Sequence, residues 1–328
     1  MKKIKILATG GTIAGKAASS TQLTGYTAGA YSVDDLLASV PALGELAQIS
    51  GEQLCNIDSS SITDALLLRL AQRCNELLAQ EDVDGVVITH GTDTMEETAF
   101  FLNLTVKSDK PVVLVGAMRP ATAVSADGPL NIINAVKTAV CAESAGQGVL
   151  VVMNDEIYGG RDVMKTNTAN VATFKAPNGG ALGCIVGGEV RYYYRSVRPH
   201  TLAAEFAISK VTALPRVDII YAHIGQDRVL VDAACAAGAR GLVYAGSGMG
   251  SIHGAVEAAL AEAVQSGVVV VRSSRTGSGR VSAGLARWQE QGFLYADNLN
   301  PQKARLLLQL ALLQTHEHSE VQELFLRY

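Results

Sequence analysis

Short runs of apolar residues recur along the chain and alternate with segments of helical periodicity. The apolar runs are Ile4–Ala8, Val86–Thr89, Val112–Val115, Val149–Met153, Val217–Ala222, Leu242–Ala245 and Val268–Val271. The helical segments between them are Asp64–Ala79, Gly128–Val140, Val231–Ala237 and Ala255–Gln265. Strands that are apolar throughout are buried on both faces, and their alternation with helices predicts an α/β fold with a mostly parallel sheet.

The length of the chain and one proline-containing segment predict two domains. A chain of 328 residues exceeds the roughly 250–300 residues at which single cores stop growing. The segment 198–216 contains Pro199 and Pro215 and few apolar runs. We therefore predict a larger N-terminal α/β domain over residues 1–197, in which helices flank the sheet, a linker over 198–216, and a smaller C-terminal α/β domain over 217–328. Within the latter, Asn300-Pro301 supplies a cap and a first residue for a helix over Pro301–Gln314.

Composition narrows the classes of partner. A formal net charge of −4 argues against nucleic-acid or anionic-membrane binding, which requires basic patches. No apolar stretch reaches the 18 residues or so that a spanning helix needs. Only 18% of residues are charged and 48% are hydrophobic, which indicates extensive burial, including subunit interfaces. The five cysteines and six histidines show no metal spacing, so we expect no metal site.

The start of the chain has a basic flank, Met1–Lys5, before an apolar run that reaches glycine at Gly10. That run is too short for a signal peptide. We therefore expect a cytoplasmic protein from the sequence as printed. A periplasmic location is the alternative if a leader has been removed.

Two loops rich in glycine and threonine follow predicted strands. Residues 8–15 read ATGGTIAG, and residues 89–97 read THGTDTMEE. Ligands of open α/β sheets bind beyond the carboxyl ends of strands, and glycine lets backbone N–H groups approach an oxyanion. Turn and capping chemistry explains one such loop, but two of them favour a site. The stretch Ala17–Ala30, small polar residues around Tyr26, is interpreted as a lid.

Several familiar site motifs are incomplete or absent in this sequence. Gly10–Lys16 spells G-x-x-x-x-G-K, but Ala17 stands where a phosphate-binding loop needs Ser or Thr. Gly246–Gly250 lacks the third glycine of a dinucleotide loop, and neither G-x-S-x-G nor S-x-x-K occurs. A threonine nucleophile helped by lysine or tyrosine remains. Lys165 is a candidate base, although a surface lysine is the simpler interpretation from sequence alone.

The two loop sequences resemble the signature motifs of bacterial L-asparaginases, more of the type II branch than of the cytosolic type I branch. Similar stretches continue along the chain at Val115–Asn131, Val151–Thr168, Val269–Gly279 and Leu299–Leu312. The resemblance implies an amidohydrolase that converts L-asparagine to L-aspartate and ammonia through an acyl-threonine, without metal or cofactor, with minor L-glutaminase activity. It also implies two α/β domains and a homotetramer, a dimer of dimers with sites at the dimer interface.

The resemblance assigns catalytic roles residue by residue. Thr12 matches the primary nucleophile, and Tyr26 lies on the lid beside it. Thr92 matches the second catalytic threonine, in hydrogen-bond contact with Lys165. Asp93 matches the group that holds the α-ammonium of the substrate.

The remaining substrate-binding positions surround these residues. Ser59 matches the group that holds the α-carboxylate, with Ser60 beside it. Backbone N–H groups at Gly11 and Gly91 are placed to stabilise a tetrahedral oxyanion, which is typically the largest single contribution to such catalysis.

Three positions depart from the pattern of the family. Ser60 stands where many relatives have Gln or Glu, and Ser251 where some have Asn. Many relatives also donate a Glu to the neighbouring subunit's substrate, whereas the segment Arg280–Gln291 here has no acid until Glu290. These departures leave the second half of the ammonium site, and substrate discrimination, open.

Two other functions compete with this hypothesis. A non-catalytic amino-acid sensor would keep the pocket but needs no paired threonines and lysine, so Thr12, Thr92 and Lys165 argue against it. A P-loop-like nucleotide-binding protein is less favoured, because the residue after Lys16 is Ala17.

Overall fold

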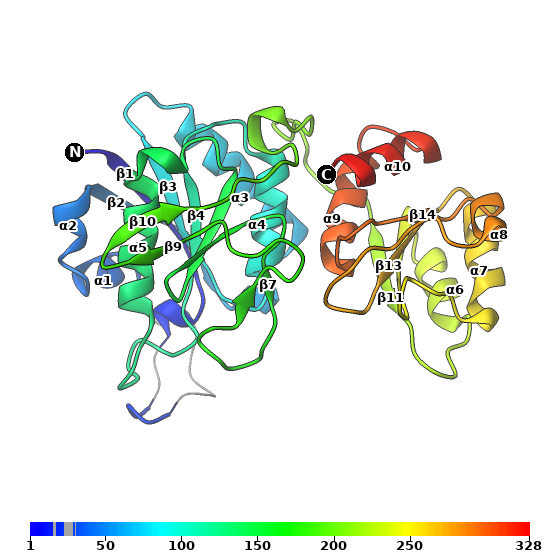
Figure 1. Cartoon of the computed structure of the whole chain (residues 1–328), viewed down its shortest axis with the longest axis horizontal. Helices are drawn as coiled ribbons and strands as arrows, with labels where there is room; N and C mark the ends of the chain where they lie inside the picture. Colours follow the sequence, from blue (N-terminus) through cyan, green and yellow to red (C-terminus); the bar gives the residue numbers. More distant parts are fainter. Residues whose placement is uncertain (16–17, 23–28, 30) are drawn as a thin grey trace. The chain divides into compact units, whose positions relative to one another are not determined.

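A computed structural model describes residues 1–15, 18–22, 29 and 31–328. The chain divides into two compact units, Met1–Lys210 and Val211–Tyr328 (Figure 1). The division falls inside the segment 198–216, whose role as a linker stays a prediction. Tyr26, and with it most of the lid inferred from the sequence, lies outside the described residues.

Within the described residues, the first unit contains an eight-stranded sheet in the order β10-β9-β6-β5-β4-β3-β1-β2. Its strands are β1 (Lys3–Gly10), β2 (Gln48–Ile57), β3 (Gly85–Thr89), β4 (Val112–Val115), β5 (Val149–Met153), β6 (Glu156–Gly159), β9 (Gly183–Val186) and β10 (Glu189–Tyr192). The pairs from β2 to β5 are parallel, and those from β5 to β10 are antiparallel. A two-stranded hairpin, β7 (Met164–Lys165) and β8 (Phe174–Lys175), stands apart from this sheet.

Helices cover both faces of the sheet. They are α1 (Val33–Ala38), α2 (Leu43–Leu46), α3 (Asp64–Leu78), α4 (Met95–Thr105) and α5 (Gly128–Val140), with short 3-10 helices η1 (Thr12–Ala14), η2 (Ser59–Ser61), η3 (Ala142–Ser144) and η4 (Thr201–Ala203). Figure 1 shows α1, α2 and α5 on one side of the sheet and α3 and α4 on the other. A buried apolar cluster joins α1, α2 and α5 to the inner strands. The site-bearing strands are therefore held in the middle of three layers.

Helices α3 and α4 differ in how much of their surface is buried. Thr63 caps α3, its Oγ1 accepting a hydrogen bond from the Leu66 N–H at 3.3 Å, and α3 buries one stripe that includes Leu67 and Cys74. Helix α4 is buried around almost its whole circumference. It begins at Met95, within the second glycine–threonine stretch (residues 89–97), so the C-terminal end of that stretch is anchored to the core.

In its described residues the second unit contains a four-stranded parallel sheet in the order β11-β12-β13-β14. Its elements are β11 (Val217–Tyr221), α6 (Val229–Ala236), β12 (Gly241–Gly246), α7 (Gly254–Gln265), β13 (Val269–Ser274), α8 (Ala286–Glu290), β14 (Leu294–Tyr295), α9 (Pro301–Ala311) and α10 (His318–Arg327). Asn300 caps α9, its side chain accepting from the Lys303 N–H at 3.1 Å. The helix begins where expected but ends at Ala311, and residues 312–314 form a turn.

The predicted fold class is confirmed: a mostly parallel α/β sheet flanked by helices, with a smaller C-terminal α/β domain. Each predicted strand is present within a few residues of its expected bounds. In the part of the chain that the structure describes, no helix is long and apolar enough to cross a membrane. The same part contains no cluster of three or more His, Cys, Asp or Glu side chains arranged to hold a metal ion.

Candidate active site

The two glycine–threonine loops emerge side by side from one edge of the large sheet. Strands β1 and β3 are parallel neighbours, and Ala8 pairs with Thr89. The loop Gly10–Thr12 follows the first strand, and the loop His90–Thr92 follows the second. A further hydrogen bond joins the two strand ends, since the Thr9 hydroxyl donates to the Thr89 carbonyl at 2.9 Å.

The backbones of the two loops are in direct contact. A Cβ placed on Gly11 would lie 2.5 Å from the Gly91 Cα, a distance that real Cβ atoms do not adopt. Gly10 and Gly11 also have φ of 104° and 83°, in the region that favours glycine. Glycine is therefore required at Gly11 on two grounds, and the close approach of Gly11 to Gly91 brings together the loops that carry Thr12 and Thr92.

Thr12 is the first residue of η1 and is 8% exposed. Its carbonyl accepts the Gly15 N–H at 2.8 Å, which closes the short helix. Ile13 packs against the start of α5 and so anchors the turn: a Cβ added to Gly128 would lie 3.0 Å from Ile13 Cγ1. The loop thus holds a buried threonine on a fixed backbone. Tyr26, assigned to its side by the resemblance, lies outside the described residues.

Ser59 joins the site from the neighbouring strand β2. It is 2% exposed and begins η2, and a Cβ on Gly91 would lie 2.6 Å from the Ser59 Oγ. The Thr94 hydroxyl donates to the Ser59 carbonyl at 2.9 Å. Ser60 is exposed, and both its N–H and its hydroxyl donate to Asp58 Oδ1 at 3.0 Å. The structure therefore brings Ser59 against Gly91, and Ser60 toward Asp58.

Lys165 meets the second loop from the hairpin β7–β8. Its Nζ donates to Thr92 Oγ1 at 2.9 Å and pairs with Asp93 Oδ1 at 2.5 Å. Thr92 is 5% exposed, and the side chains of Lys165 and Asp93 are 15% and 59% exposed. A buried hydroxyl beside an ammonium and a carboxylate can exchange a proton while the charge stays balanced. Lys165 is therefore not the solvated surface lysine of the simpler interpretation.

His90 braces the second loop from inside. It is fully buried, its Nδ1–H donates to the Gly91 carbonyl at 2.6 Å, and Nε2 lies 2.8 Å from the Thr98 hydroxyl. Burial lowers the pKa of the imidazole to about 4, so the ring is neutral near pH 7 and accepts from Thr98. In the sequence, His90 is distinguished only as a histidine without metal spacing. Its bracing role requires knowledge of burial that the sequence does not supply.

Glu96 and Asp127 are further residues that the sequence reasoning missed. Glu96 is 4% exposed, and its Oε2 accepts the backbone N–H of Lys165 at 2.5 Å. Asp127 accepts the N–H groups of Met118 and Arg119, each at 2.9 Å, and so shapes the loop after β4. Both acids lie within sequence stretches already singled out. Their partners, however, are backbone N–H groups, which every residue except proline has, so the sequence does not reveal these contacts.

The segment Arg280–Gln291, which departs from the family pattern, lies in the second unit and is held there by Arg272 of β13. Arg272 is buried, its Nη2 donates to the Ser282 and Ala283 carbonyls at 2.5 and 2.7 Å, and its guanidinium stacks 4.4 Å from the centre of the Trp288 ring. Ser251 pairs with Ser247 across a short bridge. The described site residues of the sequence analysis all belong to the first unit.

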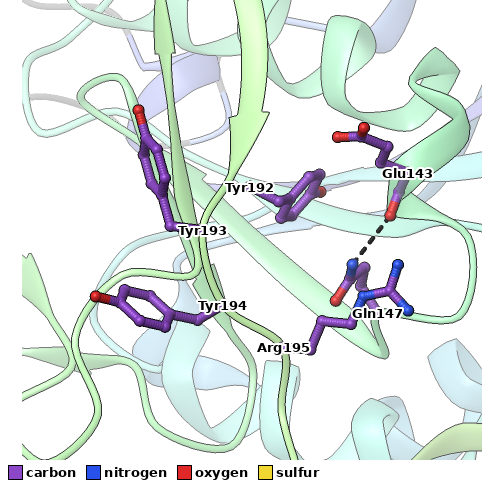
Figure 2. Close-up of a pocket in the computed structure, with 6 residues that line it drawn as sticks. All are labelled: Glu143, Gln147, Tyr192, Tyr193, Tyr194 and Arg195. Atoms are coloured by element: carbon purple, nitrogen blue, oxygen red, sulfur yellow. Dashed lines mark hydrogen bonds between the residues drawn. The ribbon is translucent and has the colours of Figure 1, made fainter.

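A separate pocket of about 380 Å³ lies elsewhere in the first unit. It is lined by Glu143, Gln147, Tyr192, Tyr193, Tyr194 and Arg195. Figure 2 shows the Tyr192 ring directed toward Glu143, while Tyr193 and Tyr194 extend to the other side of the chain. Its lining includes no residue of the glycine–threonine loops, so this pocket is distinct from the candidate active site.

Comparison with known proteins gives matches over both units. Residues 3–198 match the model "Asparaginase, N-terminal", and residues 216–325 match "Glutaminase/Asparaginase C-terminal domain". Three relatives are an L-asparaginase 2 of Bacillus subtilis (50% identical; 100% of this chain, 87% of that one), a probable periplasmic L-asparaginase of Haemophilus influenzae (48%; 99% and 93%) and a glutaminase-asparaginase of Pseudomonas fluorescens (44%; 100% and 91%). The crystal structure of a probable cytoplasmic L-asparaginase from Campylobacter jejuni superposes with a TM-score of 0.98, at 51% identity over 100% of both chains.

Proposed function

The chain belongs to the asparaginase family, and from this premise we propose how its own residues carry out the reaction. It is an L-asparaginase, an amidohydrolase that converts L-asparagine to L-aspartate and ammonia. Relatives named glutaminase-asparaginase support L-glutamine hydrolysis as a side activity. These relationships favour neither the amino-acid sensor nor the nucleotide-binding alternative.

The observation that carries the mechanism is the contact between Gly11 and Gly91, which places two buried threonines on facing loops. Thr12 Oγ attacks the side-chain amide carbon, and the carbonyl electrons move onto oxygen, where loop N–H groups stabilise the oxyanion. The C–N bond then breaks, and ammonia leaves with the proton that Thr12 has lost. Water attacks the resulting ester, the C–O bond to Thr12 breaks, Thr12 regains a proton, and L-aspartate departs.

We assign the proton transfers to Thr92. Its contact with Lys165 at 2.9 Å supports this role, because a threonine hydroxyl needs a basic or cationic neighbour to act at neutral pH. Thr92 delivers a proton to the departing nitrogen and, in the second half-reaction, takes one from the attacking water. Asp93 Oδ1, paired with Lys165, offsets the charge of the ammonium.

The substrate's two charged groups are assigned to Asp93 and Ser59. Asp93 is more than half exposed and uses Oδ1 for Lys165, so we assign Oδ2 to the α-ammonium. The buried Ser59 hydroxyl beside Gly91 receives the α-carboxylate, with Ser60 at the rim. Tyr26 keeps the role that the resemblance gives it, which is to close over Thr12 and exclude water during acylation.

A steady-state comparison of L-asparagine with L-glutamine tests the proposed function. The two amides differ by one methylene, which a pocket discriminates by about 10–200-fold in kcat/KM. We expect asparagine to be preferred within that range, because Asp93 is the one acid assigned to the substrate ammonium. Hydroxylamine added during turnover should divert the acyl-enzyme to aspartyl hydroxamate. Equal or greater kcat/KM for glutamine would contradict the specificity argument, and absence of hydroxamate would contradict the acyl-threonine.

We propose that the chain assembles as a homotetramer, a dimer of dimers. Apolar side chains around the edge strand β10 support this: Val186, Tyr193, Tyr194 and Val197 are 70%, 69%, 66% and 95% exposed. An edge strand with such neighbours is a ready contact surface. Sedimentation at micromolar concentration should give the mass of four chains. A catalytically competent monomer would rule the assembly out.

We propose a cytoplasmic location, in keeping with the name of the Campylobacter jejuni protein, a probable cytoplasmic L-asparaginase. The relative from Haemophilus influenzae is named periplasmic, so the family occupies both compartments. Cell fractionation decides the point, since recovery of the activity in the periplasmic fraction would overturn the assignment.

A further inference from the structure

Lys165 stands on a hairpin that has little structure of its own. Strands β7 and β8 have two residues each, with Met164 paired to Lys175 and Lys165 to Phe174. So short a ladder adds little to fixing the backbone, because an isolated hairpin is marginally stable even when its strands are longer. The position of the Lys165 ammonium therefore depends on how the hairpin is attached to its surroundings.

Glu96 provides such an attachment at the residue that matters. Its carboxylate is buried, and Oε2 accepts the backbone N–H of Lys165 at 2.5 Å. Glu96 is the second residue of α4, where a negative charge suits the helix dipole. It follows Thr92 by four residues and Asp93 by three. One short stretch of chain thus contacts both ends of Lys165: Thr92 and Asp93 hold the ammonium, and Glu96 holds the backbone.

We propose that Glu96 is a positioning residue for Lys165: by accepting the Lys165 N–H, it sets the distance at which Lys165 Nζ meets Thr92 Oγ1. The inference rests on the proposed function, since it takes Lys165 to act at Thr92. A displacement of about 1 Å at a reacting group can cost about 100-fold in rate. Fixing the backbone end of a lysine limits the volume that its ammonium can sample, so the loss of Glu96 should act on kcat through Lys165.

Lys175, which pairs with Met164 across the hairpin, offers a matched control. Lys175 Nζ pairs with Glu156 Oε2 at 2.9 Å, and their side chains are 44% and 36% exposed. This pair also attaches the hairpin to the body of the unit, but it does not touch Lys165 in the described contacts. An exposed ion pair contributes little, so Lys175→Gln should change kcat by less than about twofold.

The experiment measures kcat and KM for L-asparagine in Glu96→Gln and Glu96→Ala, alone and combined with Lys165→Met. The Gln variant retains an oxygen acceptor and should stay within about threefold of the parent. The Ala variant should lose about 10–100-fold in kcat with KM changed by less than about threefold. In the Lys165→Met background, Glu96→Ala should lower kcat by less than about twofold further, because coupled residues are not additive.

The outcomes separate the two proposals. Unchanged kcat in Lys165→Met alone would sink the proposed function. A low kcat in Lys165→Met, with Glu96→Ala lowering kcat by the same factor in both backgrounds, would overturn the positioning role alone. A Gln variant as slow as the Ala variant would overturn the acceptor contact. If Glu96→Ala does not fold, Glu96→Asp takes its place: its carboxylate is one methylene shorter, so full activity there would overturn the proposal.

Discussion

The loops after β1 and β3 are built from similar residues but are held in different ways. From Ala8 to Gly15 the first loop has no titratable side chain, and its shape comes from Gly10 and Gly11 at positive φ. The second loop is held by side chains: His90 braces it, and Lys165 bonds to Thr92 and Asp93. The difference indicates a division of tasks, in which backbone conformation presents a nucleophile on one loop and side chains manage protons and charge on the other.

The largest effect should follow from the first loop. Thr12→Ala removes the proposed nucleophile and should lower kcat by about 10³-fold or more, equivalent to about 4 kcal/mol in barrier height. Circular dichroism and substrate binding should remain near those of the parent, because the backbone of the loop is set by its glycines. Thr12→Ser keeps the hydroxyl and serves as the control, with most of the activity expected. Near-normal turnover in Thr12→Ala would break the assignment of tasks to the two loops.

Acidification should act through the second loop, on the stability of the fold. Burial lowers the pKa of His90 to about 4, against about 6.5 in an unfolded chain. Between these values the unfolded state binds the extra proton, so the contribution of His90 is complete above pH 6.5 and declines as pH falls toward 4. This difference in pKa between the folded and unfolded states corresponds to a loss on the order of 3 kcal/mol in the free energy of unfolding.

Denaturant unfolding of the parent and of His90→Gln at pH 7 and pH 4 measures this loss. Both proteins lose stability from their other groups, and the parent should lose on the order of 3 kcal/mol more than the variant. Equal losses would show that His90 is not the group through which acid acts on this loop.

A smaller effect should follow from Lys165→Met, which keeps an unbranched side chain as far as Cε but removes the ammonium group. General acid–base groups contribute about 100-fold or more, so kcat should fall by about 100-fold across the pH–rate profile. Lys175→Met, on the paired strand, should change kcat by less than about twofold. A change in kcat of only about twofold in both variants would contradict the proposal that side chains of the second loop manage protons and charge.

The sequence predicted those parts of the fold whose signal is local. Continuous apolar runs such as Val112–Val115 are buried strands as expected. Strand β2 went unrecognised because it is the polar outer strand of the sheet, with one buried residue, Leu54. Helix α4 also gave no periodic signal, because the protein buries it on nearly every side. The place of each element in the fold, at the edge of the sheet for β2 and deep in the core for α4, explains these two cases.

The candidate site shows the same limit. Two glycine–threonine loops after neighbouring parallel strands could be expected to meet, and Gly11 does contact Gly91. The approach of Lys165 depends on a hairpin of two-residue strands, which periodicity does not reveal. The importance of Glu96 depends on a bond to a backbone N–H. The roles of these residues in catalysis stay predictions until the variants are measured.

The place of β1 in the sheet has a consequence for the synthesis of the protein. Among the strands of this sheet, β1 is synthesised first. Its two edges are covered by β2 and β3, which follow later in the chain. At about 5–20 residues per second, β3 follows β1 from the ribosome after roughly 4 to 16 s. During that interval an apolar strand with an open edge is exposed to other nascent chains. Soluble yield should therefore respond to translation speed and to chaperones that bind the first ninety or so residues, even in variants whose finished fold is unchanged.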